Sequence, residues 1–139
     1  MKKYYFVLFL LSTALLTSCL KKRNQNKTNN IDGYWEVTYM EINGQGGFDF
    51  PGTYFDFTAC KLRERGYCDM LVSDFWEGTY SGIYNVTHQG DQVNMTIDYI
   101  TYKQPLSFDL KSLSDTRMVL ENLNPEPNTY SRLELRKQD

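Results

Sequence analysis

The sequence has little of what most enzymes and metal proteins need. It contains one histidine and three cysteines among 139 residues. His88 has no nucleophile beside it in a recognisable motif, and Cys60 and Cys68 lie too far from it for the ligand spacing of a zinc site. The longest apolar run, residues 4–16, falls short of the roughly 20 residues of a membrane-spanning helix, which argues against a transmembrane anchor. We therefore expect no enzyme activity, no bound metal and no cofactor.

Positive charge is also scarce where the chain is expected to fold. From Asp32 onward there are seventeen carboxylates against nine lysines and arginines, a formal charge of −8. A nucleic-acid-binding domain needs a basic surface, so no nucleic acid is expected as a partner. The glycine-rich segment 44–47 is followed by neither a lysine nor a predicted helix, which excludes a phosphate-binding loop.

The N-terminus carries the features of an exported protein. A basic start and an apolar run precede small residues, so residues 1–18 are predicted to be a secretory signal peptide. The sequence Leu16-Thr17-Ser18-Cys19 resembles the lipobox of bacterial lipoproteins at all four positions. The resemblance implies that Cys19 becomes the first mature residue and carries a diacylglyceryl group and an amino-linked acyl chain such as palmitate. Several acyl chains would hold the protein on a membrane essentially permanently.

Residues 19–31 are predicted to form the lipidated cysteine and a flexible tether. The segment 20–31 (LKKRNQNKTNNI) is charged and amide-rich and has no apolar period. As a coil it would span about 20 Å on average, so that the domain stands clear of the lipid. Its lysines do not resemble the acidic surface-export signal of some Bacteroidota lipoproteins. We therefore expect an anchor in the outer membrane of the bacterial cell envelope, on the periplasmic face.

With Cys19 lipidated, Cys60 and Cys68 remain as a pair in an oxidising compartment, and we expect a disulfide between them. They flank a charged segment, residues 63–66, that is predicted to be the tip of a hairpin. Two free thiols are the alternative, because the sequence does not show whether the two Cα atoms come within about 7 Å.

From Gly33 onward, aromatic and β-branched residues alternate with polar ones, and turn residues lie between these runs. The predicted strands cover residues 33–42, 53–62, 67–72, 76–87, 92–99, 105–113, 117–123 and 129–137. In the first, Trp35, Val37 and Tyr39 are expected on one face. This pattern predicts an all-β domain over residues 32–139, an antiparallel up-and-down meander closing into a small barrel of about eight strands. A two-sheet sandwich is the alternative.

The start of the first predicted strand, Gly33-Tyr34-Trp35, resembles the Gly-x-Trp signature of lipocalins. Together with the lipobox and the cysteine-flanked hairpin, it makes the chain similar to the lipocalin-like domains of Bacteroidota-type envelope lipoproteins. The resemblance implies that Trp35 packs at the closed end of the barrel beneath an arginine of the last strand. Arg132 is the first candidate for this arginine and Arg136 the second. Gly33, Trp35 and Arg132 would then be structural residues rather than ligand contacts.

Many aromatic residues are predicted to face the barrel interior. One hypothesis is that they line a small apolar cavity that opens near Phe48 and Phe50, with the glycine-rich loop as its lid. These candidate ligand-binding residues are Phe55, Phe57, Trp76, Tyr80, Tyr84, Tyr99 and Phe108. The alternative is that the same rings fill the barrel completely.

Two functions follow from these alternatives. A cavity favours a membrane-anchored lipoprotein that binds a small hydrophobic ligand. A filled barrel favours a protein-binding module, an inhibitor or assembly accessory for an envelope protein. In that case the binding surface is predicted to be a rim that includes Lys61, Arg63, Arg65 and the loop 44–50.

Overall fold

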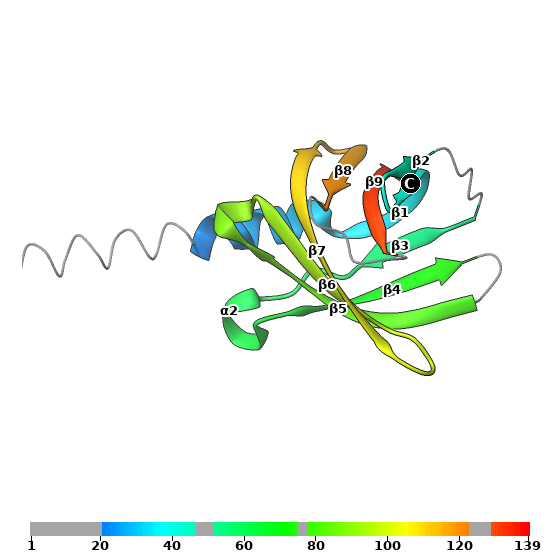
Figure 1. The fold of residues 1–139 in the computed structure, drawn as a ribbon. Helices are drawn as coiled ribbons and strands as arrows, with labels where there is room; N and C mark the ends of the chain where they lie inside the picture. The colour runs from blue at the N-terminus through cyan, green and yellow to red at the C-terminus, as the bar shows by residue number, and fades with distance from the viewer. Residues whose placement is uncertain (1–20, 47–51, 75–77, 123–128) are drawn as a thin grey trace, which may run out of the picture.

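The computed structural model describes residues 21–46, 52–74, 78–122 and 129–139. Their strands form one antiparallel sheet in the order β2-β1-β3-β4-β5-β6-β7-β8-β9, and β1 also pairs with β9 (Figure 1). Because β1 pairs with both β3 and β9, eight strands close into a barrel. The short β2 pairs only with the last two residues of β1 and is not part of the closed ring. The predicted up-and-down barrel is confirmed, and the sandwich alternative is wrong. The elements are β1 (Gly33–Ile42), β2 (Gln45–Gly46), β3 (Tyr54–Phe57), α2 (Leu62–Arg65), β4 (Cys68–Asp74), β5 (Gly78–Thr87), η1 (His88–Gly90), β6 (Gln92–Asp98), β7 (Lys103–Leu113), β8 (Arg117–Glu121) and β9 (Tyr130–Lys137).

The alternation of apolar and polar residues sets the inward face of most strands. In β6, Val93, Met95 and Ile97 are buried, and the residues between them are half-buried. In β1 the alternation shifts, because a β-bulge lies between Val37 and Tyr39 in the pairing with β9. Met40 takes the inward position, and Tyr39, predicted inward, is half-buried and donates its hydroxyl to Glu41 at 2.7 Å.

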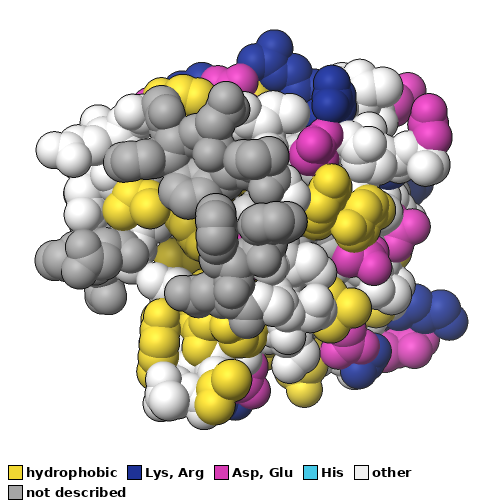
Figure 2. All heavy atoms as spheres, turned by 90° about the vertical axis from the view of Figure 1, so that its right-hand side faces the viewer, with side chains coloured by type: hydrophobic (Ala, Val, Ile, Leu, Met, Phe, Trp, Pro, Cys, Tyr) yellow, Lys and Arg dark blue, Asp and Glu magenta, His cyan; other side chains and the backbone are white. Residues whose placement is uncertain are grey.

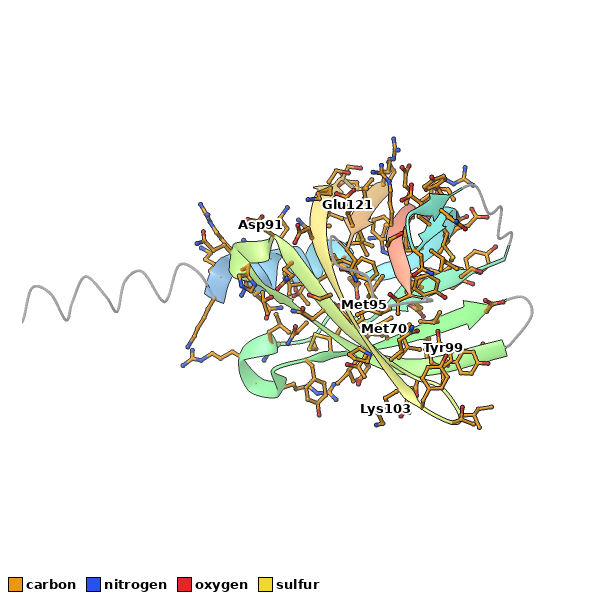
Figure 3. All side chains as sticks on the ribbon, in the orientation of Figure 1. Met70, Asp91, Met95, Tyr99, Lys103 and Glu121 are labelled. Carbon is orange, nitrogen blue, oxygen red and sulfur yellow. A yellow bond between two sulfur atoms is a disulfide. The ribbon has the colours of Figure 1, made fainter. Side chains whose placement is uncertain are left out.

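Large side chains fill the middle of the barrel. Met70 and Met95 lie between the strands there (Figure 3). A Cβ at Gly82 of β5 would lie 2.7 Å from the Thr96 carbonyl oxygen and 3.1 Å from Met70 Cγ, so the glycine makes room for β6 and for Met70. The largest fully buried side chains are Trp35, Tyr84, Phe55, Phe57, Phe108, Ile31, Met70, Ile97, Met118, Leu120, Leu133 and Leu135.

Residues 21–31 form a helix, here called the N-terminal helix, where the sequence predicted a flexible tether. It lies against one end of the barrel, in blue in Figure 1. Thr28 and Ile31 on this helix are both 0% exposed. The indole nitrogen of Trp35 donates a hydrogen bond to the Ile31 carbonyl oxygen at 2.7 Å, which ties the end of the helix to β1.

Polar contacts hold the rest of the N-terminal helix in place, which explains why no apolar period marks it. The Gln25 amide donates to the Cys60 carbonyl oxygen at 2.7 Å and accepts from the Leu62 backbone N–H at 2.9 Å. Arg23 donates to the Gln89 side chain at 3.3 Å. Within the described residues, no helix is both long enough and apolar enough to cross a membrane.

The segment between β3 and β4 is stapled by a disulfide. Cys60 and Cys68 are bonded, with their Cα atoms 5.4 Å apart, which confirms the predicted pair. The predicted hairpin tip between them is the one-turn helix α2, which ends at Gly66 with a φ of 76°.

The connections of the barrel gather at two opposite ends. We call the end with the N-terminal helix, α2 and η1 the helix end (Figure 1). We call the other the loop end, where β1 leads to β3, β4 to β5, β6 to β7 and β8 to β9. Of the predicted protein-binding rim, Arg63 and Arg65 on α2 lie at the helix end and Gly44 lies at the loop end, while residues 47–50 lie outside the described residues.

Candidate functional site

Three tyrosine rings form a ladder at the loop end. Tyr80 on β5 and Tyr99, directly after β6, are next to each other in the register that pairs Ser81 with Asp98. Their ring centroids are 4.8 Å apart, and the ring of Tyr102 stacks on Tyr99 at 4.9 Å. We call Tyr80, Tyr99 and Tyr102 the tyrosine ladder; Figure 3 labels Tyr99.

The tyrosine ladder runs from the core into solvent. Tyr80 and Tyr99 are partly buried against the core, whereas Tyr102 is 57% exposed. Ile100, which follows Tyr99 in the sequence, is 92% exposed. Figure 2 looks onto the loop end and shows hydrophobic side chains around the residues that are not described. An apolar or aromatic molecule would find flat faces there on which to stack, at about 0.5–1.5 kcal/mol for each ring pair.

Across the loop end from the tyrosine ladder, residues at the end of β1 and the start of β9 pack on the core and hold the chain that follows β1. Ile42 and Tyr130 pair across these strands and are partly buried against the core. Ser131 is only 7% exposed, and its hydroxyl accepts the Gly44 backbone N–H at 2.9 Å. This bond fixes the start of the glycine-rich loop, the predicted lid.

Four of the predicted ligand-binding residues lie in the packed core instead. Phe55, Phe57 and Phe108 are 0% exposed, and Tyr84 is 1% exposed. Phe55 stacks on Phe57, and Phe57 meets Tyr84 edge-on at 5.0 Å. Tyr84 donates to the Thr58 carbonyl oxygen at 3.3 Å, and burial, helped by the charge of Asp32, raises the pKa of its hydroxyl.

Of the seven predicted ligand-binding residues, the structure brings Tyr80 and Tyr99 together at the loop end. Trp76 lies outside the described residues, as do Phe48 and Phe50 at the predicted entrance. Tyr102 was not predicted as a site residue because it lies beyond the alternating pattern of β6. The closeness of Tyr99, Ile100 and Tyr102 in the sequence is a signal that could have predicted an apolar hairpin tip.

The cation over Trp35 is Lys137, not Arg132 or Arg136. Lys137 Nζ lies 5.3 Å from the centroid of the Trp35 ring. The register of β1 on β9 places Trp35 opposite Lys137 and Glu36 opposite Arg136. Gly33 has a φ of 120°, and a Cβ there would lie 2.7 Å from Lys137 Cε, so the glycine leaves room for the lysine stem.

Arg132, predicted to cover Trp35, instead belongs to a surface ion-pair network. Its guanidinium lies 2.8 Å from Glu134 and 3.7 Å from Glu121. The guanidinium of Arg117 also forms an ion pair with the Glu134 carboxylate at 2.6 Å. Hydrogen bonds from Arg132 and then Arg117 hold the pKa of the Glu134 carboxyl below its ordinary value.

Comparison with solved structures supports the assignment of the barrel. The chain is similar to the crystal structure of a lipocalin-like protein from Bacteroides uniformis, with a TM-score of 0.50 over 78% of this chain and 99% of that chain. The fold is lipocalin-like. With 14% sequence identity, the likeness of the two lipocalin-like barrels concerns the fold and not a ligand. No protein-family model and no curated protein matches the sequence.

Proposed function

We propose that the chain is a lipid-anchored lipoprotein of the bacterial cell envelope whose lipocalin-like barrel binds a small hydrophobic ligand at its loop end. The observation that carries the binding proposal is the tyrosine ladder, which leads from the core at Tyr80 to an exposed ring at Tyr102. Apolar surface at the mouth of a barrel is a common position for a ligand site. The proposed role is binding rather than catalysis.

The packed core argues for a ligand at the mouth of the barrel rather than deep within it. A molecule in the middle would have to displace rings such as Phe55 and Phe108, which have no exposed surface. Removing such contacts costs several kcal/mol, more than stacking on a small ligand returns. A flat molecule at the mouth instead covers Tyr99 and Tyr102 and leaves the core unchanged.

The anchor proposal rests on Cys19, which lies outside the described residues. Its support is the lipobox resemblance, the signal peptide before it and the absence of acidic residues up to Asp32. We place the protein on the outer membrane, facing the periplasm. Replacing Cys19 with serine is expected to release a folded protein from the membrane fraction, as fractionation and circular dichroism would measure.

Displacement of an environment-sensitive fatty-acid probe tests the ligand site. The wild-type protein is expected to bind the probe, and Tyr99→Ala is expected to weaken binding about tenfold, since this ring contacts both Tyr80 and Tyr102 and holds the ladder together. Tyr34→Ala is the matched control, because Tyr34 stacks on Tyr54 on the outside of the barrel. Equal binding by the two variants, or no binding by the wild type, would contradict the proposal.

A second candidate function is protein binding through the same end. The observation that favours it is Ile100, which is 92% exposed beside Tyr102 at the tip of the β6–β7 connection. Exposed apolar side chains of this size mark protein contacts as well as ligand contacts. Crosslinking in intact membranes separates the two functions: a specific partner lost in Ile100→Ser, with the probe still bound, would favour protein binding.

A further inference from the structure

A basic pocket lies at the helix end of the barrel, far from the tyrosine ladder. It has a volume of about 680 Å³, is open to solvent, and is lined by the N-terminal helix, α2 and the end of β5. Lys21, Lys22 and Arg63 line it together with seven neutral residues. Among the described residues no carboxylate lines it, although the chain carries seventeen aspartates and glutamates from Asp32 onward. The pocket therefore concentrates positive charge on an otherwise acidic domain.

The three cations of the pocket are not engaged in ion pairs with the described residues. The basic residues two positions before and after Arg63 do form ion pairs: Lys61 pairs with Glu64 at 3.4 Å, and Arg65 pairs with Asp69 at 2.9 Å. Arg63 thus differs from Arg65 in having no carboxylate partner in the described part of the chain. A planar guanidinium in this state is suited to bind phosphate through paired hydrogen bonds.

One polar side chain that lines the same pocket has a buried atom without a partner. Asn24 lines the pocket, and its Oδ1 atom is buried without a hydrogen-bond donor in the described structure. An unsatisfied buried polar atom costs about 1–3 kcal/mol. If the Asn24 side chain rotates toward the pocket, a ligand that combines an anionic group with a hydroxyl or ammonium group would satisfy the cations and Asn24 together.

The position of the pocket in the chain indicates which ligand it meets. Lys21 follows Cys19 by two residues, so their Cα atoms are at most about 7 Å apart. The headgroup layer on each side of a bilayer is about 5–8 Å thick. Because the N-terminal helix is packed on the barrel, a lipid on Cys19 would bring Lys21, Lys22 and the rest of the pocket to the headgroups.

We propose that this pocket binds the phosphate group of a membrane phospholipid, an inference that rests on the proposed lipidation of Cys19. Lys22 and Arg63 bind the phosphate oxygens, and Asn24, after its side chain rotates toward the pocket, accepts a hydrogen bond from the headgroup. The barrel then stands on the membrane with its helix end, and the tyrosine ladder at the loop end faces away from the bilayer. The predicted tether would have allowed any orientation.

The experiment measures how fast phenylglyoxal labels arginines of the mature lipidated protein in vesicles, by mass spectrometry. In vesicles of phosphatidylethanolamine and phosphatidylglycerol, labelling of Arg63 is expected to slow about tenfold relative to Arg65. In bilayers of digalactosyldiacylglycerol, which has no phosphate, this slowing of Arg63 is expected to be absent. Lys22→Gln is expected to abolish the protection, and Lys61→Gln, which loses a lysine outside the pocket, is the matched control.

The outcomes separate this inference from the anchor on which it rests. Protein that floats with both kinds of vesicle but labels equally in both would overturn the phosphate site and leave the anchor intact. Protein that floats with neither would overturn the anchor and this inference together. Protection of Arg63 in galactolipid vesicles on adding free inorganic phosphate, to the same extent as in phospholipid, would assign the pocket to soluble phosphate instead.

Discussion

The burial of Ile31 provides a direct test of whether residues 21–31 belong to the folded domain. Replacing Ile31 with alanine removes three carbon atoms from a side chain that is 0% exposed. Their transfer from water contributes about 2.4 kcal/mol, and the cavity left behind adds to this within the usual range of about 2–5 kcal/mol. We expect the free energy of unfolding to fall by about 3 kcal/mol and the melting temperature by about 10 °C.

Urea denaturation of the Cys19→Ser protein, followed by tryptophan fluorescence, measures this effect. The midpoint should fall with little change in the slope, since the folded state keeps its compactness. Asn30→Ala is the matched control, because Asn30 is exposed on the same helix. Alanine favours helices by a few tenths of a kcal/mol over asparagine, so this variant should be unchanged or slightly more stable. If Ile31→Ala is as stable as the control, the N-terminal helix does not pack on the barrel and our reasoning is wrong.

Three further effects are expected. Reducing the Cys60–Cys68 disulfide, whose cysteines are eight residues apart, should lower the free energy of unfolding by about 2–3 kcal/mol in the same urea assay, and an unchanged midpoint would refute this. Gly82→Ala should cost about 1–3 kcal/mol through its clash with β6, whereas Ser81→Ala should have little effect; equal midpoints would contradict the crowding. The lowered pKa of Glu134 stabilises the fold above its ordinary value of 4.5, and this stability is lost as pH falls through the folded pKa. Glu134→Gln should therefore flatten the acid limb of stability against pH, and a limb that stays as steep would exclude Glu134 as its source.

The barrel could be predicted because its signals are local. The alternation along β6 and the disulfide partners of the β3–β4 segment can be read within a few residues. The bounds of β1 also match the prediction, since Gly33 begins the strand and the turn at Asn43 ends it. The bulge after Val37 was not predictable, because it depends on how β9 pairs with β1.

Long-range contacts account for the other differences. The N-terminal helix has only Thr28 and Ile31 fully buried, so its sequence resembles a solvated linker. Its place is set by Gln25, whose partners lie 35 and 37 residues further along the chain. Likewise, the choice of Lys137 over Arg132 as the cation above Trp35 depends on register. The resemblance to lipocalins predicted a cation from the last strand above Trp35, but it did not predict which residue of β9 lies there, because the β-bulge in β1 shifts the pairing.

If the protein is exported as proposed, the pairing of β1 with β9 has a consequence for the order in which it folds. Glu36 and Arg136, 100 residues apart in sequence, form an ion pair at 2.8 Å across this seam. A chain that crosses a membrane from its N-terminus exposes β1 long before β9, so the barrel cannot close until translocation has passed Lys137. The disulfide, in contrast, links cysteines that emerge almost together. Oxidation is thus expected to precede barrel closure, and in the interval the unpaired edge of β1 is the part of the chain most exposed to aggregation.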